Sequence, residues 1–261
     1  MDRHKVLIAF DEQIRRHPSP DIPDGYVEHD DNVVRTMSAA AGWCGVTWSS
    51  LDTSSADAVI ATQITRFSEF ADPWEWKYYS YDQPPDLPDR LLAAGFTSEQ
   101  AETLLVAEIA DLMLDVPPPP GVELRAVVDQ QDVEALVSVN DEAFGGDHSA
   151  MGRTLLAGLA RQPRTTEAVV AWAGETPISA GRVEFHPGTD FASLWGGGTV
   201  PAWRGRGAFR SLVAHRAAQA SAQGFRYLQV DAMPDSRPIL QRLGFVELAS
   251  TTPFTHPGGA G

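Results

Sequence analysis

A chain of 261 residues is long enough for one large domain or two of modest size. Its 43% hydrophobic and 21% charged residues are ordinary for a globular protein in water, and no apolar run of about 18 residues predicts a membrane span. The single cysteine, Cys44, excludes an internal disulfide and a metal site built on thiolates. The charged first residues are unlike a secretory signal, so we expect a cytoplasmic protein that does not contact a membrane.

The net charge of −15 is spread unevenly along the chain. Residues 1–120 hold 8 Lys/Arg and 21 Asp/Glu, whereas residues 121–261 hold 12 and 14, and all 12 of those cations are arginine. The acidic balance argues against nucleic acid as a partner. Arginines gathered in the second half can still bind a smaller anion, because a guanidinium forms paired hydrogen bonds with phosphate.

The first half of the sequence contains apolar segments with both helical and strand periodicity. We predict helices over 5–16, 56–71 and 87–94, and strands over 32–39, 43–49, 74–80 and 102–109.

Four consecutive prolines mark the clearest border, because proline fits neither a helix interior nor a central strand. We predict a linker over 117–121 between an N-terminal domain, 1–116, and a C-terminal domain, 122–256; the glycine-rich tail after Pro257 is expected to be loose. In the second half the predicted strands are 122–127, 167–173, 178–185, 191–200, 226–231 and 246–252, and the predicted helices are 130–143, 151–160, 207–223 and 236–243. This order indicates an α/β fold with a mixed (α+β) sheet.

The two halves end in the same way. A strand, a short helix, a Gly-Phe pair and a second strand occupy 74–109 and again 226–252. The repeated order suggests a duplicated unit.

The segment from Gly196 to Arg210 leads from a strand through a glycine-rich turn into an amphipathic helix. Glycines let a backbone approach a ligand closely, and the first amides of a helix, at the positive end of its dipole, bind phosphate groups. Arginines in and after the turn add fixed positive charge. The residues expected to hold a pyrophosphate are Gly198, Thr199, Val200, Arg204, Gly205, Arg206, Gly207, Ala208, Phe209 and Arg210.

Two nucleotide-binding motifs do not fit this turn. A P-loop requires a lysine after its last glycine, and none follows here. The dinucleotide fingerprint requires a third glycine, and Arg210 stands in its place after Gly205 and Gly207.

The segment Arg204-Gly205-Arg206-Gly207-Ala208-Phe209 resembles the [Q/R]-x-x-G-x-[G/A] turn of the GNAT (GCN5-related N-acetyltransferase) superfamily, except that Phe209 replaces the last small residue. Thr199 to Pro201 resembles that family's splayed strand end, and 239–245 its closing helix with a Gly-Phe turn. The resemblance covers about residues 122–252. It implies a GNAT acyl-CoA acyltransferase fold, tandem if the N-terminal half is a degenerate second copy that does not bind acetyl-CoA.

The resemblance also implies chemistry. Family enzymes let an amine attack the thioester of acetyl-CoA, with a backbone amide, here near 198–200, polarising the carbonyl. Many members protonate the leaving thiol with a tyrosine, whose position in this chain is Leu240. That departure leaves the proton donor open.

The catalytic candidates are therefore drawn from the residues around the expected cleft. Glu184, near the end of a strand, is a candidate base or else a glutamate that faces solvent, and His186 beside it is expected at the surface. Asp231 ends a strand that faces the cleft. Ser236 is a candidate proton donor or simply the N-cap of its helix, and Tyr227 is the other nearby hydroxyl.

Acidic residues in the loop between the first two helices of the second half lie where the family binds its acceptor. Asp141 and Glu142, with Asp147 and His148 nearby, would attract a cationic amine, although a loop of this composition is also simply soluble.

We therefore interpret the chain as an acetyl-CoA-dependent N-acetyltransferase for the amine of a small molecule or peptide, without a metal, acting as a monomer or homodimer. The alternative is a GNAT-fold sensor or scaffold that binds CoA without turnover.

Overall fold

The computed structural model describes residues 1–20, 25–38, 43–69 and 73–258. The chain forms two compact units that are discontinuous in sequence. The first comprises Met1–Leu105, Asp231–Pro238 and Glu247–Gly261, and the second comprises Val106–Val230 and Ile239–Val246. Each unit is described by itself.

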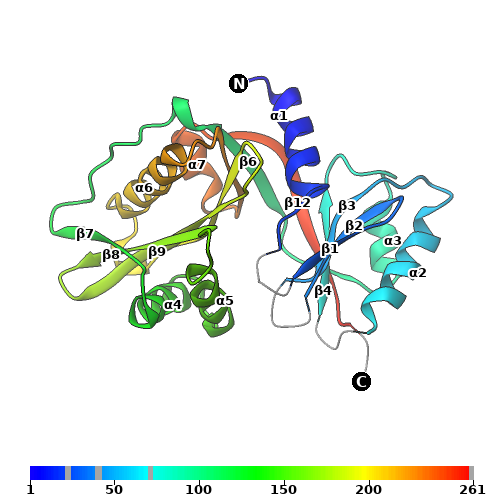
Figure 1. The fold of residues 1–261 in the computed structure, drawn as a ribbon, viewed down its shortest axis with the longest axis horizontal. Helices are drawn as coiled ribbons and strands as arrows, with labels where there is room; N and C mark the ends of the chain where they lie inside the picture. Colours follow the sequence, from blue (N-terminus) through cyan, green and yellow to red (C-terminus); the bar gives the residue numbers. More distant parts are fainter. Residues whose placement is uncertain (21–24, 39–42, 70–72, 259–261) are drawn as a thin grey trace. The chain divides into compact units, whose positions relative to one another are not determined.

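The first unit is a sheet with helices packed against it (Figure 1). Its strands are β1 (Tyr26–His29), β2 (Val33–Met37), β3 (Gly45–Ser49), β4 (Trp74–Tyr79), β5 (Thr97–Ser98), the start of β6 (Glu102–Glu108) and most of β12 (Val246–His256). Its helices are α1 (Arg3–Phe10), continued by a π-helical turn over Asp11–Arg15, then α2 (Ala56–Phe67) and α3 (Leu87–Ala93). β1, β2 and β3 pair antiparallel, β4 lies parallel to β3, and β12 pairs antiparallel with β4.

The second unit repeats this pattern of pairing. Its strands are β7 (Val122–Ala126), β8 (Thr166–Ala173), β9 (Thr176–Phe185), β10 (Phe191–Thr199) and β11 (Tyr227–Ala232), which leaves the unit at Asp231. Its helices are α4 (Gln130–Phe144), α5 (Ser149–Leu159), α6 (Ala208–Ala222) and most of α7 (Arg237–Arg242). β7 to β10 pair antiparallel in sequence order, and β11 lies parallel to β10.

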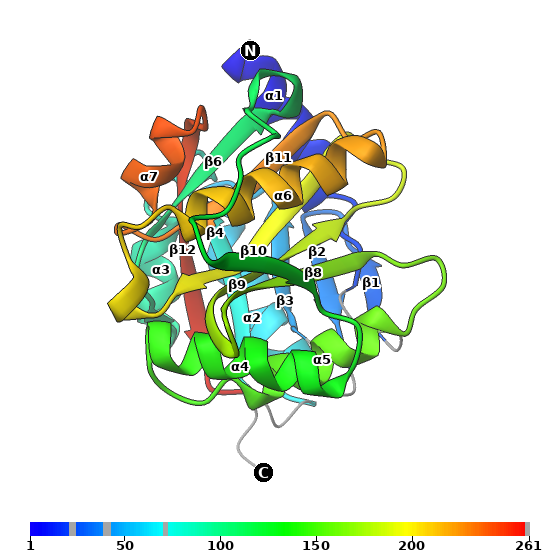
Figure 2. The same cartoon turned by 90° about the vertical axis from the view of Figure 1, so that its left-hand side faces the viewer.

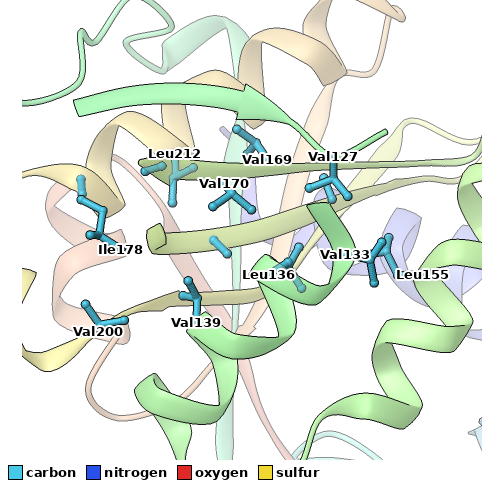
Figure 3. Packing of buried hydrophobic residues seen from close by; sticks show 14 of the residues in the cluster. Val127, Val133, Leu136, Val139, Leu155, Val169, Val170, Ile178, Val200 and Leu212 are labelled. Carbon is cyan, nitrogen blue, oxygen red and sulfur yellow. The ribbon is translucent and has the colours of Figure 1, made fainter. Parts of the chain in front are cut away.

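Helices cover both faces of the second sheet, with α4 and α5 on one face and α6 on the other (Figure 2). Apolar side chains at helical spacing explain this, because α4 turns Val133, Leu136 and Val139 toward the strands (Figure 3). On the opposite face Leu212 of α6 is completely buried. Both layers therefore fix the position of β9 and β10 between them.

The predicted α/β fold with a mixed sheet is confirmed, and the helices and strands expected from the sequence are present with ends shifted by a few residues. The sequence did not indicate the short strands β1 and β5 or the π-helical turn. The ends of the predicted strand 32–39 and helix 56–71, and the last residues of the tail, lie outside the described residues.

The units also differ from the expected domains 1–116 and 122–256, which are continuous in sequence. Because compactness in space does not reveal the origin of a segment, the linear boundary at the prolines stays a prediction. In the part of the chain that the structure describes, no helix has the length and apolar character required to cross a membrane.

Leu136 tests how strongly α4 holds the second sheet. Leu136→Ala removes a side chain with 1% exposure and leaves a cavity, so we expect a loss of about 2–5 kcal/mol in the free energy of unfolding. Urea unfolding followed by fluorescence measures it. Ser138→Ala, an exposed position on the same helix, is the control; an equal effect at both positions would contradict the role assigned to Leu136.

Candidate functional site

The site begins where β10 parts from β11. These parallel strands are paired in register only from Phe191 opposite Tyr227 to Ser193 opposite Gln229, although β10 continues to Thr199. On its other side β10 stays paired with β9 as far as Thr199. The opening therefore exposes one edge of β10 while the other edge remains in the sheet.

Glycines shape the open part of β10. The register with β9 shifts between Trp195 and Gly198, which is a β-bulge, and Gly196 there has φ +55°. Such a bulge turns backbone groups out of the ladder. A Cβ on Gly198 would lie 2.9 Å from the Phe144 ring, so the end of α4 packs directly on the strand. The bulge lies at Gly196 and Gly197, slightly before the amides near 198–200 expected from the sequence.

The turn after β10 delivers the start of α6. Gly205 and Gly207 have φ +73° and +95°, in the left-handed region that strongly favours glycine. The first helical hydrogen bond runs from Ser211 N to Gly207 O at 3.2 Å, so the amides of residues 208–210 precede it. No side chain caps this helix start and its first turn holds no acidic residue. These amides fit an anionic ligand.

Two of the predicted phosphate-binding arginines have partners within the protein. Arg204 donates to the carbonyl oxygens of Thr199 (3.1 Å) and Ala143 (2.8 Å), tying the turn to the end of α4. The guanidinium carbon of Arg206 lies 4.8 Å from the centre of the Trp203 ring. Arg204 thus shapes the turn, while the exposed Arg206 and Arg210 keep their charge at the surface.

A pocket of about 270 Å³ lies along the outer face of α6. Helical spacing places Arg210, Val213, Ala214 and Ala217 on one stripe of the helix. That stripe faces residues 112–117, and Arg242 and Leu243 close the pocket. The lining thus combines apolar side chains with an arginine from each helix and with Asp115.

The opposite face of the sheet carries Glu184. Its carboxylate accepts from Arg182 Nε at 2.8 Å, and the Arg182 guanidinium lies 5.7 Å from the centre of the Trp195 ring. The side chain of Glu184 is 23% exposed, so it is not the freely solvated glutamate that the sequence left open. The Glu184 carboxylate therefore already has a cationic partner within the protein.

His186 forms a polar chain beside Glu184. Its Nε2 is hydrogen-bonded to Ser193 Oγ, which also accepts from Gln229 Nε2 at 2.8 Å. Burial lowers the pKa of His186, against a smaller opposing effect of Glu184. The imidazole is therefore neutral at physiological pH and able to accept a proton, whereas the sequence favoured a surface position.

Two other catalytic candidates belong to the first unit. Asp231 Oδ2 lies 3.2 Å from Lys77 Nζ and its side chain is 5% exposed, while Ser236 Oγ donates to the carbonyl oxygen of Met233 at 3.1 Å. Ser236 therefore bonds back to the preceding turn, and its role as a proton donor stays a prediction. Asp231 is paired with the half-buried Lys77, and its role as a base also stays a prediction.

The candidate residues of the second unit differ in their exposure and in their hydrogen bonds. Asp141 Oδ1 accepts from His148 N at 2.9 Å and lies 2.8 Å from its Nδ1, which fixes the start of α5, whereas Glu142 is exposed. Leu240 is 1% exposed and apolar. Tyr227 pairs with Phe191, before the bulge, and its role in place of the missing tyrosine stays a prediction.

The equivalent helix start in the first unit is preceded by a carboxylate. Asp52 precedes α2, and its Oδ1 accepts from Ser54 N (2.8 Å) and Ser55 N (2.9 Å). These hydrogen bonds, first that of the Ser54 hydroxyl, lower the pKa of Asp52 to about 2. A fixed carboxylate at this position repels phosphate, which favours the expectation that the first unit does not bind acetyl-CoA.

The sequence analysis missed three residues at the bulge: Arg182, Asn140 and Arg216. Ideal Cβ atoms on Gly196 and Gly197 would lie 3.4 Å from nitrogens of all three. The sequence does hold a sign that Arg216 is buried. It follows Leu212 by four residues, so it lies on the otherwise apolar face of the predicted helix.

Comparisons with known proteins identify the architecture. No protein-family model matches the sequence, and the search of curated proteins gives no match. Among solved structures, a GCN5-related N-acetyltransferase from Kribbella flavida is similar over 99% of this chain and 96% of its own, with a TM-score of 0.71 and 18% identity. The chain has a GNAT fold.

Two further GNAT structures support the same conclusion. A protein from Novosphingobium aromaticivorans assigned to the GNAT family covers 90% of this chain and 92% of its own (TM-score 0.57, 16% identity). A tandem GNAT protein from the clavulanic acid biosynthesis pathway covers 92% and 86% (TM-score 0.59, 14% identity). Both units thus fall within the similarity, and the predicted tandem GNAT fold is confirmed.

The lowered pKa of His186 makes stability depend on pH. Because the unfolded chain binds a proton more readily at this residue, stability falls as the pH drops below about 6.5, by at most about 1.4 kcal/mol per pH unit. We expect His186→Gln to lose less stability than wild type between pH 7.5 and pH 5 in urea unfolding. An identical loss in both proteins would contradict a neutral His186 with a lowered pKa.

Proposed function

We propose that the protein is an N-acetyltransferase that takes its acetyl group from acetyl-CoA and that the second unit binds this donor. The observation that carries the proposal is the combination of an opened, bulged β10 with an uncapped helix start at Gly207. A strand edge with free backbone groups suits the amide-containing arm of CoA, and the helix start suits its pyrophosphate.

Each part of the proposed site has a distinct task. The amides of Ala208, Phe209 and Arg210 bind phosphate oxygens, and Arg206 and Arg210 add charge. Arg204 holds the turn in shape through Thr199 and Ala143. The bulge at Gly196 and Gly197 presents backbone donors where the thioester carbonyl would lie.

The acceptor amine must lose a proton before it attacks, and His186 is the strongest candidate for receiving it. Its half-buried, neutral imidazole is hydrogen-bonded to Ser193 on the strand that carries the bulge. Glu184 has only an indirect role in this reaction, because its carboxylate forms an ion pair with Arg182. The proposal includes no metal, and among the described residues no cluster of His, Cys, Asp or Glu has the form of a metal site.

The alternative function, a CoA-binding sensor or scaffold, has one observation in its favour. Leu240 is buried and apolar where many GNAT enzymes carry the tyrosine that protonates the thiol. Both functions require CoA binding, so turnover separates them.

Substitution of Gly207 tests the phosphate site. Both Gly207→Glu and Gly207→Gln strain the same left-handed backbone position, but only glutamate adds a charge against the pyrophosphate. We expect glutamate to weaken CoA binding by about 100-fold or more relative to glutamine, from Coulomb repulsion at short range. Isothermal titration calorimetry with CoA measures the two affinities, and circular dichroism checks that both variants fold. Equal affinities would sink the assignment of this turn.

Release of free thiol tests catalysis. Acetyl-CoA is mixed with an aminoglycoside, spermidine, free amino acids or a short peptide, and thiol is followed with a colorimetric reagent. An acetyltransferase releases thiol with at least one amine, and His186→Gln should lower that rate by about 10²-fold or more, the usual contribution of a general base. Tight CoA binding without thiol release from any amine would instead support the sensor.

A further inference from the structure

Arg216 is a buried cation that no carboxylate neutralises. It is 1% exposed and donates to two backbone carbonyls, Leu212 O in its own helix and Arg182 O in β9, each at 3.1 Å. No acidic side chain of the described residues forms an ion pair with it. Buried charges are normally paired, because removing an ion from water costs several kcal/mol.

Two glycines make the space for this guanidinium. A Cβ on Gly181 of β9 would lie 2.6 Å from Arg216 Nη1, and one on Gly197 of β10 would lie 3.4 Å from Nη2. The planar group therefore lies flat against two neighbouring strands. Gly197 belongs to the bulge, so the charge lies directly behind the backbone that the proposed site uses.

A second guanidinium lies at the same point on the opposite face of the sheet. Arg182 Nη1 is 3.4 Å from the position of a Cβ on Gly196, but Glu184 neutralises Arg182. Burial, with Arg182 as a second cation, lowers the pKa of Arg216 to about 9, which still leaves it charged at neutral pH. The excess positive charge at the bulge thus comes from Arg216.

We propose that Arg216 is a positioning residue for acyl transfer, whose unpaired charge polarises the bulge of β10 toward the thioester carbonyl oxygen. The missing counter-charge is the negative charge that develops on this oxygen during the reaction. The inference rests on the proposed function and identifies which side chain makes the bulge electrophilic.

The charge is required at one step of the transfer. The amine nitrogen attacks the thioester carbon, a C–N bond forms, and the carbonyl electron pair moves to oxygen. The carbonyl then re-forms as the C–S bond breaks, and the proton lost from nitrogen balances the proton gained by the thiolate. Only the intermediate carries full negative charge on oxygen, so a fixed cation lowers its energy more than that of the substrate.

The test compares Arg216→Met, which removes the charge, with Arg216→Lys, which keeps it. Arg153→Met makes the same charge change at an exposed position in α5 and serves as the matched control. Infrared difference spectroscopy of bound [1-¹³C]acetyl-CoA reports the polarisation of the thioester carbonyl directly, and it needs no acceptor. Calorimetry with CoA and melting temperatures are measured for every variant.

We expect the carbonyl band of bound acetyl-CoA to lie at lower wavenumber in wild type, Arg216→Lys and the control than in Arg216→Met. With an amine that the wild type acetylates, kcat should fall about 10- to 100-fold in Arg216→Met, less in Arg216→Lys and not in the control. The affinity for CoA should change by less than about threefold, because the ground state gains little from the charge.

Three results would overturn the proposal. An unchanged carbonyl band and kcat in folded Arg216→Met would leave Arg216 a structural residue. Equal losses of kcat, CoA affinity and melting temperature in Arg216→Met and Arg216→Lys would also mean that Arg216 has a structural role. The kcat of Arg216→Met is also measured with succinyl-CoA as donor. A fall in kcat with succinyl-CoA but not with acetyl-CoA would show that the charge binds an anionic acyl group instead. A wild type that does not bind CoA would overturn the proposed function itself, and this is recognised before any variant is compared.

Discussion

A β-strand can leave one neighbour and keep the other only where its residues tolerate an irregular backbone, and the site depends on how β10 meets this constraint. β10 leaves β11 after Ser193 but remains paired with β9 on both sides of its bulge. Glycine is needed at each step. Gly196 adopts positive φ, Gly197 lies against Phe209 and Arg216, and the ring of Phe144 packs on Gly198. The same glycines thus open the strand edge and allow side chains from α4 and α6 to close on it.

The sequence predicted what repeats regularly along the chain. Apolar spacing gave the elements of both halves, and the arginine-glycine turn gave the start of α6, because these signals are local. Contacts between residues that are distant in sequence leave no local signal, so the sequence did not predict them. His186 follows a strand next to a Pro-Gly turn, which predicts exposure, yet it is half-buried and bonded to Ser193, which Gln229 of a third strand also contacts. Arg204 is expected at the phosphate site from the local turn, whereas the carbonyl that it also bonds lies 61 residues earlier, in α4.

The two units share a pattern of strands and helices but differ in the charge before one corresponding helix. Both have antiparallel strands followed by a helix and a parallel strand, so α2 and α6 occupy corresponding places in their units. Neither helix start has a side-chain cap, but the carboxylate of Asp52 accepts hydrogen bonds from the two amides just before α2. A carboxylate there supplies the negative charge that an anionic ligand would otherwise bring. One residue before the helix start thus distinguishes the two units.

At Arg216, inside the protein, stability of the fold and interaction with a ligand make opposite demands on charge. Its two hydrogen bonds to carbonyl oxygens satisfy part of the guanidinium but do not neutralise it, and a nearby Asp or Glu would stabilise the fold by doing so. Such a carboxylate would also cancel the positive potential at Gly197, just as Glu184 cancels that of Arg182. An apolar residue in place of Arg216 would fit the rest of the face that α6 turns to the sheet, where Leu212 and Ala220 are fully buried. A charge kept unpaired at this cost is better explained by a ligand that supplies its counter-charge than by the packing of α6.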